Sequence, residues 1–302
     1  MRKLVVVSVV GCLLALGLGI FTAEIFAAPK KTIAVSEFEN KSGWSGGWKI
    51  GWRMQEMMAT SLIDTGRFTV LERQDLSSVM AEQDLGASGR AASGSAAAVG
   101  QLARAQILIS GAVTEFEEKK GGEGAGIGFK GFRIGGSHEQ AHVAINVRIY
   151  DTTTGEVLDS LRVAGSADAG GLKIGYSNSD FGGDLGGFRK TPLGEATQEA
   201  IDEAVQKIAS RLKNVPWQGK IIKASPSQVY INSGSEGGIS DGMEFDVYRQ
   251  GEALIDPDTG LNLGAETEKI GRVKVNDVKE KFAIAEVVSG SDMERGDLVK
   301  TD

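Results

Sequence analysis

The sequence predicts a mixed α/β (α+β) unit that carries two glycine-rich β-hairpin inserts and is followed by a small all-β, barrel-like unit. Three observations support this prediction. Short β-type runs alternate with helical apolar stripes as far as residue 213, and many short strands at close spacing fill residues 214–302. Glycine makes up 42 of the 302 residues, about twice its usual share. The length alone favours about two domains of roughly 150 residues each.

Residues 1–27 have the pattern of an export signal. A basic head precedes an apolar stretch that starts at Leu4, and small residues close the stretch, so cleavage is predicted after Ala27. Cys12 also fits a lipoprotein cleavage box, but the apolar residues that follow it favour ordinary cleavage over lipidation. An uncleaved membrane anchor is a third alternative, since about 20 apolar residues span a bilayer. All three alternatives place the mature protein outside the cytoplasm of a bacterium.

Residues 28–213 form the predicted α/β unit. Apolar residues at alternate positions predict strands, and apolar residues at three- and four-residue steps predict helices. The last helix opens at Thr191-Pro192, because proline is tolerated in a first helical turn. Pro216 marks the end of the unit. The predicted strands are 32–38, 68–71 and 107–111 with a hairpin over 143–161, and the predicted helices are 50–62, 75–80, 96–105 and 191–212.

Two glycine-rich segments, 121–137 and 165–190, interrupt this unit. In each, apolar residues alternate with glycine or polar residues on both sides of a predicted turn, at Lys130-Gly131 in the first and at 177–180 in the second. Each predicted hairpin therefore has one apolar face. The candidate lipid-facing residues are Ala125, Ile127, Phe129, Phe132, Ile134, Leu172, Ile174, Tyr176, Phe181 and Leu185.

Strands of about ten residues with one apolar face are what a transmembrane β-barrel requires. A bilayer offers the backbone no hydrogen-bonding partner, so the strands must close on one another. Four strands cannot close a barrel, which means that several subunits would have to contribute hairpins to a shared wall. The alternative is two glycine-rich loops outside the membrane, and the pattern alone favours it because glycine weakens strands.

Several segments resemble the CsgG family, the secretion channel for curli-type amyloid fibres. They are residues 33–38, 68–76, 107–111 and 143–158, and they follow the family order within residues 31–212. The resemblance implies a homo-oligomeric ring whose hairpins merge into one large outer-membrane barrel. It further implies outer-membrane lipids and secreted fibre subunits as partners. Both glycine-rich inserts fall where this family has its membrane hairpins.

The same resemblance implies that a loop after the first strand narrows the pore. The family's pattern of tyrosine, asparagine and phenylalanine is not reproduced in this loop, and the loop looks shorter. An equally weighted alternative is that its two tryptophans fix the loop onto the first helix. The candidate constriction residues are Asn40, Lys41, Ser42, Trp44 and Trp48.

Residues 214–302 resemble the C-terminal domain of the flagellar assembly protein FlgT. The resemblance rests on 229–232, Gly242-Met243 and Gly296-Asp297, and the type curli channel lacks such a unit. Asp256 and Asp258 do not have the spacing of a calcium-binding EF-hand loop, so a tight turn is favoured there. The predicted strands are 219–223, 228–232, 244–248, 270–275 and 282–288.

The composition restricts the function further. One cysteine and two histidines, His138 and His142, argue against disulfide scaffolds, zinc sites and most histidine-based catalysis, and a formal net charge of −7 argues against nucleic-acid binding. We therefore expect no enzyme activity, no cofactor and no metal. The predicted function is a ring-forming, outer-membrane-associated secretion or assembly component for curli-like extracellular fibres. The alternative is a soluble periplasmic accessory protein of envelope or flagellum assembly.

Overall fold

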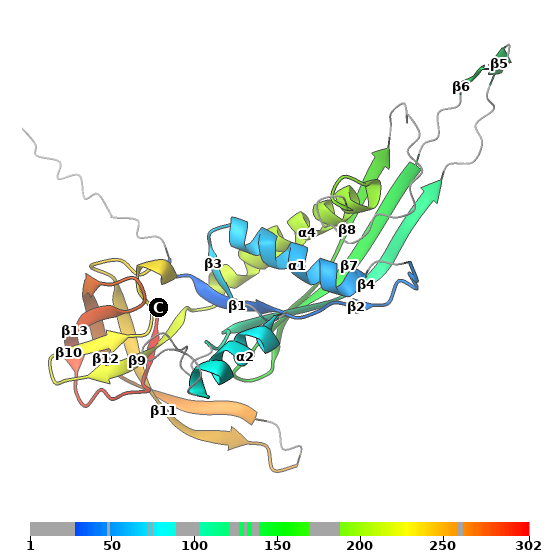
Figure 1. The fold of residues 1–302 in the computed structure, drawn as a ribbon. Helices are drawn as coiled ribbons and strands as arrows, with labels where there is room; N and C mark the ends of the chain where they lie inside the picture. Colours follow the sequence, from blue (N-terminus) through cyan, green and yellow to red (C-terminus); the bar gives the residue numbers. More distant parts are fainter. Residues whose placement is uncertain are drawn as a thin grey trace, which may run out of the picture.

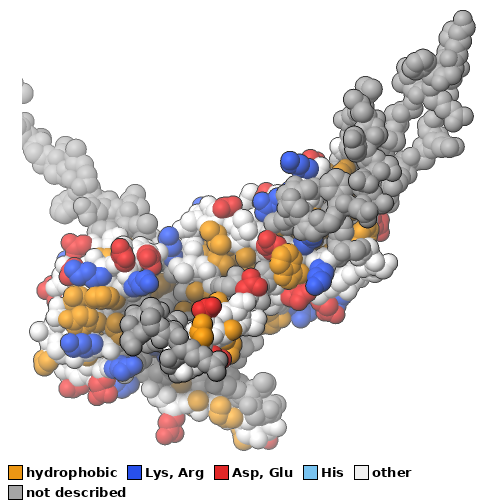
Figure 2. Space-filling model, in the orientation of Figure 1, with side chains coloured by type: hydrophobic (Ala, Val, Ile, Leu, Met, Phe, Trp, Pro, Cys, Tyr) orange, Lys and Arg blue, Asp and Glu red, His pale blue; other side chains and the backbone are white. Residues whose placement is uncertain are grey.

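The computed structural model describes residues 28–46, 49–71, 73, 75–88, 103–120, 127–129, 132–134, 139–169, 188–258 and 262–301. An α/β unit and a C-terminal β unit lie end to end (Figure 1). Acidic and basic side chains are interspersed over the visible face of both units (Figure 2). The predicted export signal, with Cys12, lies outside the described residues.

One mixed sheet forms the centre of the α/β unit. Its strands follow the order β3-β1-β4-β7-β8, with β2 beside β4. β1 runs parallel to β3 and β4, whereas β4, β7 and β8 are antiparallel neighbours. The strands are β1 (Lys31–Val35), β2 (Glu39–Asn40), β3 (Phe68–Leu71), β4 (Ile107–Lys120), β7 (Glu139–Asp151) and β8 (Val157–Ala169).

Helices α1 (Ile50–Asp64) and α4 (Pro192–Arg211) pack on one face of this sheet (Figure 1). Thr191 caps α4, because its hydroxyl oxygen accepts a hydrogen bond from the Gly194 amide at 3.1 Å. The apolar stripe predicted for α4 is buried along its whole length, and so are the alternate apolar residues of β7. A third helix, α2 (Leu76–Ala87), begins directly after Asp75.

Close approach of α4 to β8 depends on Gly165. A Cβ atom at this position would lie 2.1 Å from the carbonyl oxygen of Ala196 and 2.7 Å from the amide nitrogen of Ala200. Small residues on both elements therefore bring the helix onto the sheet, and any side chain at position 165 would push it away.

The C-terminal unit is all β. Its strands close in the order β10-β13-β12-β11-β14-β9, and a 3₁₀ turn, η2 (Ser235–Gly237), follows β10. The buried side chains of this unit include Phe245, whose ring centroid lies 5.3 Å from that of Trp217. The strands are β9 (Gln218–Ala224), β10 (Gln228–Ile231), β11 (Glu244–Ile255), β12 (Asn262–Val278), β13 (Ala283–Gly290) and β14 (Leu298–Lys300).

Hydrogen bonds join the two units. The Lys30 amide donates to the Gly237 carbonyl at 2.8 Å, and the Gln106 side-chain amide donates to the Pro216 carbonyl at 2.8 Å. The chain therefore runs along the C-terminal unit before it enters β1. Between the units, α4 is followed by a 3₁₀ turn, η1 (Leu212–Asn214).

Most predicted elements are confirmed, and the differences are local. β11 and β12 are much longer than predicted, and β14 was not predicted at all. The predicted alanine-rich helix at 96–105 is described only at 103–105, where the chain is not helical. The predicted strands were too short because exposed polar residues in these strands interrupt the alternation of apolar and polar positions on which the predictions rested.

Within the first predicted insert, 121–137, the structure describes only a short ladder. The predicted bounds of the second insert, 165–190, were too wide, because residues 165–169 belong to β8, and residues 188–190 are also described. β5 (Ile127–Phe129) pairs antiparallel with β6 (Phe132–Ile134), and Phe129 lies opposite Phe132. The side chains of these strands are outside the described residues, as is Ala125. The same holds for the candidate residues of the second insert, Leu172, Ile174, Tyr176, Phe181 and Leu185.

Candidate functional site at the insert end of the sheet

The two inserts leave the sheet from the same end. β4 ends at Lys120, β7 begins at Glu139 and β8 ends at Ala169. These three residues lie side by side in the ladder, since Lys120 pairs with Glu139 and Glu139 pairs with Ala169. Figure 1 shows the three strands extending together toward this end. Cross-strand register thus brings together two segments that are more than 30 residues apart in sequence.

A β-bulge in β4 gives the two faces of this end different character. The register between β4 and β7 shifts between Val113 and Glu115. Val113 and Phe116 consequently both face the core, at 0% and 4% exposure, although two residues lie between them and regular alternation would place them on opposite faces. Glu115 is placed on the opposite face, which the helices α1 and α4 do not cover.

An aromatic cluster lies on the core side. The ring centroids of Trp44 and Phe116 are 5.1 Å apart in an edge-to-face arrangement, and those of Phe116 and Phe188 are 6.5 Å apart. Phe188 lies near the end of the predicted second insert and is the first residue described after Ala169. The loop after β2, the β4 strand and the return of the second insert therefore meet at one point.

Four of the five predicted constriction residues form one turn that is closed by its own hydrogen bonds. The Asn40 side-chain oxygen accepts from the Ser42 hydroxyl at 2.8 Å, and the Asn40 side-chain nitrogen donates to the Trp44 carbonyl at 2.9 Å. The Lys41 amide donates to the Val113 carbonyl at 2.8 Å, which attaches the turn to β4. Trp48 lies outside the described residues.

The indole of Trp44 is half-buried and packs on β4. Its ring nitrogen is buried, and it has no hydrogen-bond acceptor in the part of the chain that the structure describes. A buried donor without an acceptor costs about 1–3 kcal/mol. Such a group in a native structure calls for a specific explanation.

A polar network covers the opposite face of the same end. Glu115 accepts hydrogen bonds from Arg162 and lies 2.9 Å from His142 Nε2. His142 Nδ1 lies 3.0 Å from the Ser166 hydroxyl, and the Ser166 amide donates to Glu199 at 2.7 Å. The hydrogen bond from Arg162 is the main cause that lowers the pKa of Glu115 from its ordinary value. The network joins β4, β7, β8 and α4 just before the inserts begin.

Sequence reasoning missed this network, and His142 entered it only as one of the two histidines of the chain. A serine, a histidine and a glutamate in a hydrogen-bonded row have the composition of a hydrolytic triad. However, the Ser166 amide is occupied by the Glu199 carboxylate, so it cannot stabilise an oxyanion. The hydrogen-bond geometry therefore favours a structural role for the network, which links neighbouring strands of the sheet. Among the described residues, no group of His, Cys, Asp and Glu side chains could hold a metal ion.

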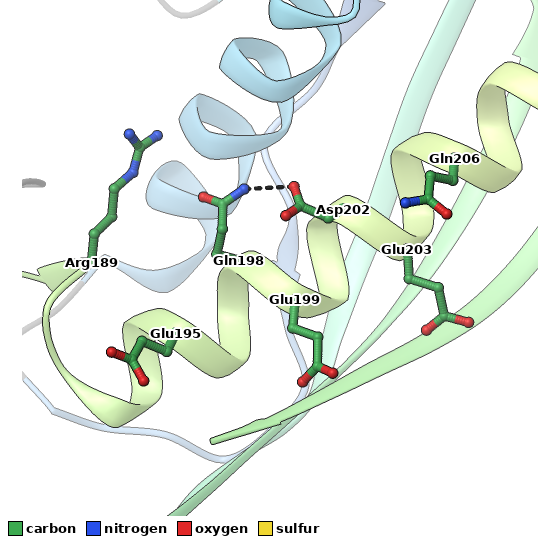
Figure 3. A pocket seen from close by; sticks show the side chains of 7 residues that line it. All are labelled: Arg189, Glu195, Gln198, Glu199, Asp202, Glu203 and Gln206. Atoms are coloured by element: carbon green, nitrogen blue, oxygen red, sulfur yellow. Dashed lines mark hydrogen bonds between the residues drawn. The ribbon is translucent and has the colours of Figure 1, made fainter. Parts of the chain in front are cut away.

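An open groove of about 530 Å³ runs along α4 (Figure 3). Gln198 points from α4 toward α1, where its amide donates to the Ser61 hydroxyl at 3.1 Å, and it also donates to Asp202 at 2.8 Å. Charged side chains dominate the lining, which is a solvated helix face. The lining residues are Arg189, Glu195, Gln198, Glu199, Asp202, Glu203 and Gln206.

Two buried carboxylates with partly exposed cations hold the base of the long β11–β12 hairpin. The Asp246 carboxylate, 3% exposed, accepts from Lys269 and from Arg272 Nε, the latter at 2.9 Å. The Asp297 carboxylate, 7% exposed, accepts from Arg249 Nε at 3.1 Å and Nη2 at 2.9 Å. Hydrogen bonding to Asp297 is the main cause that raises the pKa of Arg249 above its ordinary value.

The described helices include none with both the length and the apolar character needed to cross a membrane.

Fold and site together define an α/β protein whose sheet carries two adjacent inserts at one end and an all-β unit at the other. The sequence model of the family described as curli production assembly/transport component CsgG matches residues 21–230, so the chain belongs to the CsgG family. The model of the flagellar assembly protein T C-terminal domain matches residues 227–297. Both resemblances drawn from the sequence are confirmed.

Curated relatives share modest identity with this chain. A protein of Neisseria meningitidis serogroup B, named as a predicted lipoprotein, is 28% identical over 192 residues, which cover 62% of this chain and 78% of that protein. CsgG of Salmonella typhimurium and of Escherichia coli K12 are each 26% identical over 112 residues, or 36% of this chain. The match spans 40% of the length of those CsgG proteins.

Solved structures align only weakly. A hypothetical protein from Chlamydia trachomatis aligns over 61% of this chain and 98% of that chain, with 13% identity and a TM-score of 0.38. A PelC dodecamer from Paraburkholderia phytofirmans aligns over 59% of this chain and 88% of that chain, with 16% identity and a TM-score of 0.29. TM-scores of this size do not establish a shared fold.

Proposed function

We propose that this chain is a non-enzymatic, ring-forming subunit of an outer-membrane-associated component that exports or assembles curli-like extracellular fibres. One observation carries the proposal: the ends of β4, β7 and β8 lie in register, so both inserts start side by side at one end of the sheet. Two hairpins that start from neighbouring strand ends can continue the sheet outward together.

The proposed role of the inserts follows from their composition. Continued in register, the two hairpins of one subunit supply four strands with an apolar face for lipid and a glycine-rich face for the lumen. Since four strands have two open edges, the hairpins of neighbouring subunits must pair to complete the wall. The ring is therefore a condition for membrane insertion in this proposal.

The loop at residues 40–48 has the proposed role of narrowing the passage. Its attachment to β4 through Lys41 holds it at the base of the inserts. The half-buried indole of Trp44 packs edge-to-face on Phe116 of β4, beneath the loop. In this proposal Trp44 supports the loop from below, and Asn40, Ser42 and Trp48 contribute to the constriction.

The proposed location is the cell envelope. The predicted export signal at residues 1–27 supports a location outside the cytoplasm. The relatives named as a lipoprotein and as curli production components agree with that location. The proposed partners are further copies of this chain, outer-membrane lipids and secreted fibre subunits.

Cysteine labelling in intact cells tests the membrane role. In the proposed wall, Ile127→Cys and Leu172→Cys face lipid and react slowly with a water-soluble maleimide. The matched variants Gly126→Cys and Lys173→Cys face the lumen and react fast. Equal labelling within both pairs, together with release of the chain by an alkaline membrane wash, would refute the shared barrel.

The second candidate function is a soluble periplasmic accessory protein of envelope or flagellum assembly. The match of residues 227–297 to the flagellar C-terminal domain supports it. In this case the inserts never enter lipid, and the alkaline wash releases the whole protein. Retention of the chain in the washed membrane favours the first candidate.

A further inference from the structure

The β11–β12 hairpin continues beyond the barrel that it helps to form. β14 pairs with β11 only at residues 246–248, and β13 pairs with β12 only from Gly271 onward. Between these points β11 and β12 pair with each other, and Figure 1 shows the hairpin projecting from the barrel. Residues 250–258 and 262–268 of this hairpin are termed the arm.

The arm is both acidic and apolar. It contains no lysine or arginine. Residues 250–255 are all exposed, and Leu254 and Ile255 each keep 54% of their surface in solvent. Two exposed aliphatic side chains on a hairpin without further strand neighbours favour a partner that covers them. The acidic residues of the arm are Glu252, Asp256, Asp258, Glu266 and Glu268.

The opposite wall of the barrel has complementary chemistry. In the closed strand order, β9 and β10 lie across the barrel from β11 and β12. On β9, Lys220 and Lys223 are exposed beside Ile222, which keeps 44% of its surface in solvent. The Lys223 ammonium lies 5.2 Å from the centre of the half-buried Tyr230 ring on β10. These four residues are termed the basic face, and Glu286 of β13 lies at its border.

We propose that the arm of one copy docks on the basic face of a second copy. Leu254 would cover Ile222 and Tyr230, while the arm carboxylates face Lys220 and Lys223. The arm and the basic face lie on opposite sides of one barrel, so a chain cannot satisfy its own contact. The resulting contact is head-to-tail, which generates rings when the rotation between copies closes.

This inference rests on the ring of the proposed function and adds a second contact to it. The inserts would join the copies at one end of the molecule, and the arms would join them at the other. Complementary charge gives such a contact its specificity, since like charges brought together suppress wrong registers.

A cysteine pair tests the docking in the full-length protein. Leu254→Cys and Ile222→Cys are introduced together, and mild oxidation is followed by non-reducing electrophoresis. Every chain then carries both halves of the contact, so the expected product is a ladder of covalent oligomers. Each single variant gives dimers at most. Particle size of the detergent-extracted protein is measured on the same samples.

Charge reversal supplies the specificity test. Glu252→Lys with Glu266→Lys should lower the yield of the ladder about tenfold at low salt, because like charges then meet across the contact. Adding Lys220→Glu and Lys223→Glu to the same chain should restore it. The matched controls Asp64→Lys and Lys213→Glu change exposed charges outside both surfaces, and should leave the yield unchanged.

The outcomes separate the two proposals. Ring-sized particles without a ladder would overturn the docking and leave the proposed function standing. A ladder from a chain that the alkaline wash releases would support the docking and overturn the membrane role. Small particles without a ladder would overturn both.

Discussion

In two regions of this protein, the insert end of the α/β sheet and the arm of the C-terminal unit, strands extend beyond the core. The ion pairs at the bases of these two regions differ in burial. At the insert end, the side chain of Glu115 is 38% exposed where it meets His142 and Arg162. At the base of the arm, Asp246 and Asp297 are 3% and 7% exposed beneath their cations. The residue types are similar and the cations are partly exposed at both places, but only the carboxylates at the base of the arm are shielded from water.

The difference in burial decides what each network contributes. Water screens an exposed ion pair, so such pairs contribute about 0–1 kcal/mol in typical cases. A buried carboxylate that loses its cations is left uncompensated, which costs about 3–5 kcal/mol. The arm should therefore depend on its ion pairs, whereas the insert end should depend on the helix–sheet core beneath it.

Removing the cations from Asp246 should have the largest effect. Lys269→Ala combined with Arg272→Ala leaves the buried carboxylate without these partners, and the free energy of unfolding should fall by about 4 kcal/mol. Denaturant unfolding followed by Trp217 fluorescence measures it. The control Lys274→Ala with Lys279→Ala removes exposed pairs and should cost below about 1 kcal/mol. Equal losses in both variants would contradict the comparison.

Truncating the core below the insert end should have the next largest effect. Ile145 is fully buried in β7, and Ile145→Ala should lower the free energy of unfolding of the α/β unit by about 3 kcal/mol. Ile145→Val leaves a smaller cavity and should cost about 1 kcal/mol. Thermal unfolding followed by circular dichroism gives both values. If Ile145→Ala lowers the free energy of unfolding by less than Ile145→Val does, the core repacks around the cavity and the prediction is wrong.

Adding one methyl group at Gly165 should destabilise the same core where α4 packs on β8. The new Cβ would meet the Ala196 carbonyl at 2.1 Å, so α4 must shift, and Gly165→Ala should cost about 2 kcal/mol. The neighbouring Ala164 is exposed, and Ala164→Ser should stay within about 0.5 kcal/mol. Chemical denaturation of both variants measures the contrast, and similar midpoints would refute the close packing of α4 on β8.

Removing the charge of Glu115 should have the smallest effect and a definite pH dependence. The folded-state pKa of Glu115 is lowered from 4.5, so its ionised form stabilises the folded state above that pH. The contribution is lost as the pH falls from 4.5 through the lowered value. Glu115→Gln should therefore be less stable than the wild type at pH 7, and the two should converge in strong acid. Unfolding midpoints of the wild type and the variant, measured from pH 7 into strong acid, test the direction of this pH dependence. A stability difference between the two proteins that grows in acid would contradict it.

Much of the fold could be predicted from local patterns. The α4 stripe from Leu193 to Leu212 and the alternation from Val143 to Ile149 each repeat with the period of their element, and both are buried as predicted. Thr191-Pro192 and the turn at 151–155 specify where elements begin and end. These features need only neighbouring residues, so one sequence suffices.

The candidate site was only partly predictable. The loop residues Asn40 to Trp44 were identified, but their closed hydrogen-bonded turn and the packing of Trp44 on Phe116 were not. The projecting length of β11 and β12 was also missed. Exposed strands beyond the barrel lack the alternation of polar and apolar residues that marks a half-buried strand.

By itself the sequence determined the type and order of most elements, the family and the succession of an α/β unit by an all-β unit, because periodicity, turn residues and composition are local properties. Only the tertiary structure decided that the inserts start side by side and that Glu115, His142, Arg162 and Ser166 meet. Those contacts depend on strand register and on one bulge in β4, and a shift of a single residue would turn each side chain to the other face.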